Sequence, residues 1–402
     1  MPVHLDAMPA AAAMPPPIRR GVWLLLLGGT VGVGAALTLV TWPKDAPASG
    51  GWFWSCLLAF PVLSWMFLLG LRLYIQDLQI NYARDRNRRR KDRLLAETQR
   101  GQRSIAVMAS AYETAMGKED LGEMLANGGD GMQSILPADG GDPVRYSMLP
   151  EVVQTEKGGL ASLRPLFRRI LERMAPQLHT LPRSVPVHVR LQVSAGSDLA
   201  NVEQAWRDAS AEYLPAATSL RLVEANAGLL LLDQWLDVQE AGRDVFLVLA
   251  LQIRVAPLDH AGEAVAALLL ARDAKRWESP PLATLHRPVS FSQGDLSARL
   301  ADAILWGKRA ADQIGGLWTG GMDATSLNAV TAAASQAKVG SAIAEGLTHF
   351  DVDTSLGQTG LAAGWLAAAA AAERCHKEVQ PQLVAVSENG HQRVLVVAPA
   401  ET

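Results

Sequence analysis

Four acidic residues of the C-terminal half, Glu224, Asp323, Asp351 and Asp353, could cluster in the folded chain. Paired carboxylates can share a proton and act as general acid and general base. Aspartates in turns and at the starts of helices, however, more often cap backbone N–H groups. We therefore expect capping and turn formation for three of the four.

The other candidate nucleophiles and ligands lack partners at a recognisable spacing. Ser194, Ser197 and Ser326 have no matching histidine, and His349 and Asp351 would share one face of a strand without forming a triad. Cys56 and Cys375 are too few and too far apart for a disulfide framework or a zinc site. The sequence therefore predicts neither a metal nor a cofactor.

Composition excludes one broad class of function. The 402-residue chain is 49% apolar and has a net charge of -3, and its length suits two or three domains. A nucleic-acid-binding domain would be clearly basic, so we expect no nucleic-acid partner.

Two uncharged apolar stretches, residues 21–42 and 52–71, are each long enough to cross a bilayer. A cleaved signal peptide is the alternative for the first, but a second stretch follows at once and no convincing cleavage site precedes it. The sequence predicts a transmembrane hairpin over residues 18–73, in contact with membrane lipids, after a disordered N-terminus over residues 1–17. Gly28 and Gly32 have the spacing that lets two spans pack closely.

Basic residues flank the hairpin on one side only. Arg19 and Arg20 precede it, and a run rich in arginine follows Arg72, whereas the loop between the spans has only Lys44 and Asp45. Because basic residues stay on the cytoplasmic side, both termini are predicted to be cytoplasmic.

The predicted hairpin continues as a long basic helix over residues 74–116, followed by a linker and small helical region over residues 117–185. The basic run has no apolar face. It is an orientation signal and solvated surface, or else it contacts anionic lipid head groups.

Residues 186–402 alternate between strand and helix patterns, which favours a layered α/β domain. Its most informative stretch is Asp351 to Cys375, in which a glycine-rich turn at Gly357 and Gly360 precedes a helix composed almost entirely of alanine. Such a helix is stable where it is buried and other backbones approach it closely.

This turn, the stretch Gly262 to Leu268 and the finish from Gly390 to Val397 resemble the β-ketoacyl synthases of the thiolase fold. The resemblance implies a nucleophilic cysteine, two histidines and a lysine. An ungapped count places these four at degenerate positions, listed here in that order: Glu224, Trp318, Gln358 and Asp353. On this basis the chain is predicted not to be an enzyme, and to have no catalytic residues.

The whole arrangement resembles the bacterial type VI secretion lipase-adapter family. That resemblance implies an inner-membrane, non-catalytic adapter with a phospholipase effector and a secretion-tip protein as partners, and a homodimer is an option. The alternative is a membrane-tethered thiolase-fold enzyme or acyl-binding protein with substituted site residues. A polytopic transporter is disfavoured, because two spans without intramembrane charge provide no pathway.

Overall fold

The computed structural model describes residues 8–400 except 46, 138–139, 151–162, 183–184, 195–198, 216–217, 224–226, 239–243, 273–276 and 278. It divides into two compact units, His4–Glu97 and Thr98–Thr402. Glu224 and Ser197, both named above, lie outside the described residues.

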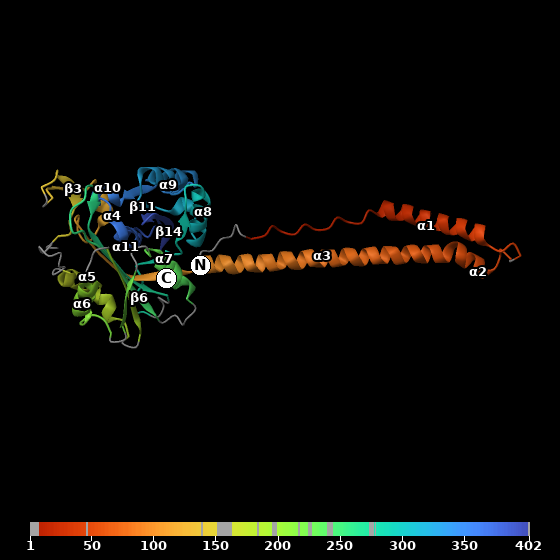
Figure 1. Cartoon of the computed structure of the whole chain (residues 1–402), viewed down its shortest axis with the longest axis horizontal. Coiled ribbons are helices and arrows are strands. Elements are labelled where there is room, and N and C mark those ends of the chain that lie inside the picture. Colours follow the sequence, from red (N-terminus) through yellow and green to blue (C-terminus); the bar gives the residue numbers. More distant parts are fainter. Residues whose placement is uncertain are drawn as a thin grey trace. The chain divides into compact units, whose positions relative to one another are not determined.

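The first unit is a helical hairpin (Figure 1). Its elements are α1 (Arg20–Thr41), α2 (Gly51–Trp54), the π-helix η2 (Ser55–Ala59) and the start of α3 (Phe60–Gly101). Two helices are long and apolar enough to cross a membrane, and their most apolar windows are only 6% and 0% buried. Apolar side chains therefore face outward along both helices.

The two spans approach each other at Gly34, not at the predicted glycine pair. A side chain on Gly34 would clash with Pro61, whereas one on Gly28 or Gly32 would meet nothing within 4 Å. The Nε1 of Trp65 donates to the carbonyl of Trp23 at 2.9 Å and sets the register of the hairpin. The expectation that Gly28 and Gly32 form the contact is wrong, because the rigid proline ring needs the space at Gly34.

The predicted helix over residues 74–116 is wrong at its end. Helix α3 stops at Gly101, and residues Ser104–Thr114 form strand β1. This strand is buried along nearly all of its length and pairs with β8 and β9. Its alanines and its Val107 and Ile105 suit a central strand, where neighbours on both faces decide the conformation rather than helix propensity.

The second unit confirms the predicted layered α/β fold. Its helices are α4 (Leu121–Ala126), α5 (Leu163–His179), α6 (Leu199–Ser210), α7 (Leu230–Asp237), α8 (Leu296–Trp306), η4 (Ala311–Gln313), α9 (Ala324–Gln336), α10 (Val352–Leu356), η5 (Gly360–Ala362) and α11 (Ala363–Glu378). Its strands after β1 are β2 (Gln133–Ile135), β3 (Val144–Ser147), β4 (Val187–Val193), β5 (Thr218–Val223), β6 (Val245–Gln252), β7 (Ala261–Gly262), β8 (Ala264–Ala271), β9 (Ala283–His286), β10 (Val289–Phe291), β11 (Gly316–Gly320), β12 (Thr348–Asp351), β13 (Gln382–Glu388) and β14 (His391–Pro399).

Most of these strands form one large sheet in the order β12-β11-β13-β14-β9-β1-β8-β6-β4-β5. Strands β4, β5 and β6 run parallel to one another, as do β11, β12 and β13. Strand β1 and helix α5, which precede residue 186, therefore belong to the same compact unit as the rest of the sheet. A separate small sheet has the order β2-β3-β7.

Helix α11 lies at the centre of the unit (Figure 1). Every residue from Ala363 to Ala372 is buried, and the helix packs against strands of both halves of the large sheet, among them β8 and β13. The predicted buried alanine helix is therefore confirmed. Because alanine ends at Cβ, strands can approach this helix on several sides at once.

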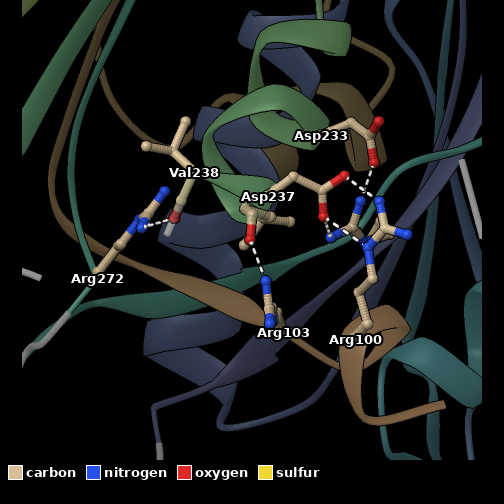
Figure 2. A network of polar contacts seen from close by, with 8 residues as sticks. Arg100, Arg103, Asp233, Asp237, Val238 and Arg272 are labelled. Atoms are coloured by element: carbon tan, nitrogen blue, oxygen red, sulfur yellow. Dashed lines mark hydrogen bonds and ion pairs between the residues drawn. The ribbon is translucent and has the colours of Figure 1, made fainter. Parts of the chain in front are cut away.

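A polar network holds the C-terminal end of α7 (Figure 2). Arg100 donates to both carboxylate oxygens of Asp237, at 3.0 Å from Nε and 2.5 Å from Nη2. Arg287, whose side chain is 1% exposed, pairs with Asp233 and, at 2.7 Å, with Asp237. These pairs lower the pKa of Asp237 below its ordinary value although burial alone would raise it. Arg103 donates to the Leu236 carbonyl at 3.2 Å, so cations lie at the negative end of the helix dipole.

We expect Arg287→Ala to lower the free energy of unfolding by about 3–5 kcal/mol, because it leaves two carboxylates without their buried partner. The matched control is Arg168→Ala, which breaks an exposed pair with Glu172 and should cost at most about 1 kcal/mol. Denaturant unfolding of the full-length protein in detergent measures both. Equal losses in the two variants would contradict the assigned role of Arg287.

Candidate functional site

A cavity of about 770 Å³ lies along the hairpin, but the candidate site is a cavity of the second unit at which backbone turns and polar side chains converge. It has a volume of about 480 Å³ and lies at the carboxyl ends of β4 and β6, where parallel sheets commonly bind ligands. Its lining includes Ser194, Gln252, Arg254, Leu258, Gly360 and Asn389.

Gln252, the last residue of β6, connects the cavity to the glycine-rich turn. Its Oε1 accepts a hydrogen bond from the Leu361 N–H at 3.3 Å. Gly360 has a φ of +54°, and a side chain there would clash with the Gln252 amide. The turn between α10 and α11 is therefore shaped to bring its backbone against β6.

A buried carboxylate lies next to the cavity, on the last residue of β13. Glu388 is 1% exposed; its Oε2 accepts from the Leu229 N–H at 3.0 Å and from Arg393 at 2.6 Å. Side chains on Gly228 and Gly364 would clash with it. Burial raises the pKa of Glu388, while the Leu229 N–H and the Arg393 cation oppose that rise.

This carboxylate lies at the N-terminus of α7, where the helix dipole favours negative charge. Asn389, the next residue, lines the cavity. Helix α7, the β13–β14 turn and the start of α11 thus meet beside the cavity. The arrangement can hold a ligand with a hydrogen-bonding group at Gln252 and apolar contacts at Leu361 and Leu258. The Ser194 hydroxyl already donates to the Ile253 carbonyl at 2.7 Å.

Trp318, one of the predicted degenerate positions, is a buried packing residue. It lies in β11 with 0% exposure, stacks on Phe350 with ring centroids 4.4 Å apart, and donates from Nε1 to Gln382 at 3.1 Å. The ring also fills the space beside Gly122.

Gln358, the second such position, holds the glycine-rich turn through its backbone. Its N–H donates to the His260 carbonyl at 2.9 Å and its carbonyl accepts from Gly262 at 3.1 Å, while its side chain is exposed. Trp318, Gln358 and Asp353 are all absent from the lining of the 480 Å³ cavity.

Asp353, the third, lies in α10 close to Asp351. Its Oδ2 accepts from the Gly321 N–H at 2.6 Å, and its Oδ1 is buried with no hydrogen-bond partner in the part of the chain described. Burial, together with the neighbouring charge of Asp351, raises the pKa of Asp353 to about 7.

The other predicted acidic residues take the capping positions expected of them. Asp323 accepts from the Ser326 N–H at 2.7 Å at the start of α9, and Asp351 accepts from the Asp353 N–H and the Thr354 hydroxyl. His349 does not pair with Asp351 directly. Both contact the Thr319 hydroxyl, at 2.9 Å and 3.3 Å, and Thr319 is fully buried.

Sequence reasoning missed Glu388, Gln252 and Arg393. The available signals were the Asn389–Gly390 pair, which is typical of a tight hairpin turn, and the lone Gly364 in an alanine helix. A glycine there indicates that another group approaches closely. Nothing in the sequence indicated that this group is a carboxylate.

Among the described residues, no group of three or more histidine, cysteine, aspartate or glutamate side chains could hold a metal ion. No family model matches the chain, and no curated protein matches it.

Solved structures match it well. The ketosynthase from module 6 of the bacillaene synthase of Bacillus subtilis 168 is 13% identical with a TM-score of 0.54, over 74% of this chain and 71% of that one. The ishigamide ketosynthase/chain length factor is 14% identical with a TM-score of 0.57, over 74% and 100% of the two chains. An oxazolomycin ketosynthase domain from Streptomyces albus JA3453 is 13% identical with a TM-score of 0.51, over 74% and 95%.

The larger unit has the ketosynthase fold. The thiolase-like resemblance stated from the sequence is thereby confirmed at the level of fold.

The prediction that the chain is not an enzyme is contradicted by the same matches. The solved structures with this fold are polyketide synthase ketosynthases, which are enzymes, and no contact among the described residues shows inactivation. The prediction relied on an ungapped count along the chain. Catalytic positions are set by where turns converge in space, and such a count does not locate them.

The stability of the ketosynthase-fold unit should fall between about pH 4 and pH 7 because of Asp353. The unfolded carboxyl loses its proton near its ordinary pKa of 3.8, whereas the folded one keeps it up to about pH 7. The folded state therefore binds more protons in this window. Asp353→Asn removes the effect, so the variant should gain stability relative to the unmodified protein between about pH 5 and about pH 8.

Denaturant unfolding at the two pH values measures the difference. Asp323→Asn is the control, because the pKa of the exposed Asp323 is lowered by the Ser326 N–H, so its contribution to stability is already complete at about pH 5 and does not change across the range. His349, whose pKa is lowered by burial, titrates in every variant and cancels. An unchanged pH dependence in Asp353→Asn would refute the assignment.

Proposed function

We propose that this protein is a membrane-anchored adapter whose ketosynthase-fold unit binds a protein partner. The observation that carries the proposal is the hairpin: apolar side chains point outward along both helices, and the same chain continues into a large folded unit. Outward apolar side chains over the length of a bilayer favour a lipid environment. The consequence is a binding unit held at a membrane.

Exposed apolar side chains on the ketosynthase-fold unit support partner binding. Leu136 directly follows β2 and is 67% exposed, Met148 directly follows β3 and is 50% exposed, and Leu258 lies just before β7 and is 54% exposed. By the register of the small sheet β2-β3-β7, Leu136 and Leu258 lie at the end where β3 begins, and Met148 lies at the end where β3 finishes. Exposed apolar residues that lie near one another on a surface mark sites of protein association, so Leu136 and Leu258 are the stronger candidates.

The resemblance to the lipase-adapter family suggests which partner this is. We propose a phospholipase effector of a type VI secretion system, together with a secretion-tip protein, at the bacterial inner membrane. The basic residues on one side of the hairpin support two cytoplasmic termini. Strand β5, at the end of the large sheet, offers an edge for a homodimer.

Affinity capture of the detergent-solubilised protein from its native host should recover a phospholipase. Leu136→Asp combined with Leu258→Asp should reduce recovery at least about tenfold, because buried charge opposes an apolar interface. The matched control is Leu199→Asp, which changes a residue that is 53% exposed on α6.

Failure to recover any lipase or secretion-system protein would contradict the adapter proposal. A reporter enzyme fused after Thr402 tests the orientation independently. Reporter activity confined to the periplasm would reverse the proposed topology while leaving the adapter proposal standing.

A second candidate function is binding of an acyl ligand, favoured by the 480 Å³ cavity in a ketosynthase fold. A long-chain acyl-coenzyme A is the probe, measured by calorimetry on the full-length protein. We expect binding that Ala256→Trp, which fills the rim of the cavity, weakens at least about tenfold. If this variant bound the acyl-coenzyme A as tightly as the unmodified protein, the cavity would be excluded as the acyl-binding site.

A further inference from the structure

Helix α3 carries an apolar face that continues beyond the predicted span. Leu71 is 46% exposed, Ile75 41%, Leu78 49% and Tyr82 69%. Their spacing of four, three and four residues places them on one side of a helix that turns by about 100° per residue. Leu73 and Tyr74, which are also exposed, lie on other sides of the helix, but every large apolar side chain that is exposed from Ile75 to Tyr82 belongs to the row. Such a row is unusual for a solvated helix.

Three arginines extend the same row. Arg86, Arg89 and Arg93 follow Tyr82 at spacings of four, three and four residues, and all three are exposed. None of them forms an ion pair with any residue in the described ranges. Asp85 and Asp92, also exposed, lie beside the row, so the face consists of an apolar half and a cationic half that two aspartates border on one side.

The rest of the hairpin unit covers a different side of α3. Trp65 donates a hydrogen bond to α1, and the N-terminal segment is hydrogen-bonded along α3. Gln76 donates to the Pro16 carbonyl at 3.2 Å and Arg90 to the Pro9 carbonyl at 2.8 Å. The Asn87 side chain accepts from the Ala12 N–H at 2.8 Å and donates to the Ala12 carbonyl at 3.0 Å. By helical rotation Trp65, Gln76 and Asn87 lie about 100–140° from the middle of the row. Arg90 is nearer, about 40° from Arg86 and about 60° from Arg93. The row remains open within this unit.

Helix length decides whether a bilayer could cover the row. Trp65 is level with Trp23, and the arginine that starts α1 lies three residues, or about 4.5 Å, beyond that level. Tyr82 is about 25 Å beyond Trp65 along α3, and Arg93 about 42 Å. The head-group layer adds only about 5–8 Å to each side of the hydrocarbon, and the surface charge is screened within about 8 Å.

We propose that this face of α3, Leu71 to Arg93, docks an amphipathic helix of another protein with an apolar stripe followed by acidic residues. The apolar half fits leucine-like side chains at heptad spacing, and the three unpaired arginines fit glutamates on the same face. A second copy in parallel register would place arginines against arginines. Charge thus selects an acidic partner helix.

The proposal rests on the proposed membrane anchoring, so the test uses the full-length protein in nanodiscs of neutral lipid. The probe is a labelled helical peptide with leucines at heptad spacing and three glutamates at one end, compared with the same peptide carrying lysines instead. We expect the glutamate peptide to bind at least about tenfold more tightly, measured by fluorescence anisotropy.

Variants assign the binding to the face. Two variants should each lower the affinity for the glutamate peptide at least about tenfold. One is Leu78→Glu, and the other combines Arg86→Glu, Arg89→Glu and Arg93→Glu. The matched control reverses three cations on another side of the same helix, Arg84→Glu, Arg88→Glu and Lys91→Glu, and should leave most of the binding intact. Equal losses from the two triple variants would overturn the proposal, since they would indicate unspecific charge attraction.

Two further outcomes would also overturn it. If the purified protein is a dimer and Leu78→Glu dissociates it, the partner on this face of α3 is a second copy of the chain. If phosphatidylserine in the nanodisc abolishes peptide binding without any peptide–lipid interaction, the face lies on the lipid surface. Failure of the protein to enter nanodiscs at all would instead refute the membrane anchoring.

Discussion

The ketosynthase-fold unit depends on one packing constraint, the complete burial of α11 among strands of both halves of the large sheet. A helix can be surrounded in this way only if its side chains are small, since each added methylene in a close-packed interior costs about 1–3 kcal/mol in strain. Of the ten consecutive buried residues Ala363 to Ala372, all except Trp365 and Leu366 are alanine or glycine and meet that requirement. The Trp365 indole donates to Gln192 of β4 at 2.8 Å.

The same constraint explains where polar groups gather. Because α11 has little side-chain volume, the turn before it and the β13–β14 turn can reach the N-terminus of α7, and Glu388 occupies the space left by Gly228 and Gly364. At the other end of α7, Asp233 and Asp237 pair with Arg287 and Arg100. Both ends of this short helix are thus fixed by charge. Asn389, which follows Glu388, lines the cavity, so the charged contact at the start of α7 lies directly behind one part of the cavity wall.

The hairpin unit follows a different rule. Its apolar side chains point outward, and its close internal contacts are few and specific, such as Gly34 against Pro61 and Trp65 against Trp23. A lipid environment would account for the outward residues over the length of the spans. The apolar and cationic row on α3 extends past that length, which is why the proposed docking face is placed there.

The sequence by itself determined the two apolar helices, the alternation of strand and helix after residue 186, and the buried alanine helix, because each is a local pattern that only one environment satisfies. It did not place β1, since SIAVMASAYET suits helix or strand until β8 and β9 pair with it. Nor did it locate the site. Glu388, Gln252 and Leu229 are far apart along the chain, and only the packing around α11 brings them together. Burial then raises the pKa of Glu388 and Asp353, which no sequence pattern could have indicated.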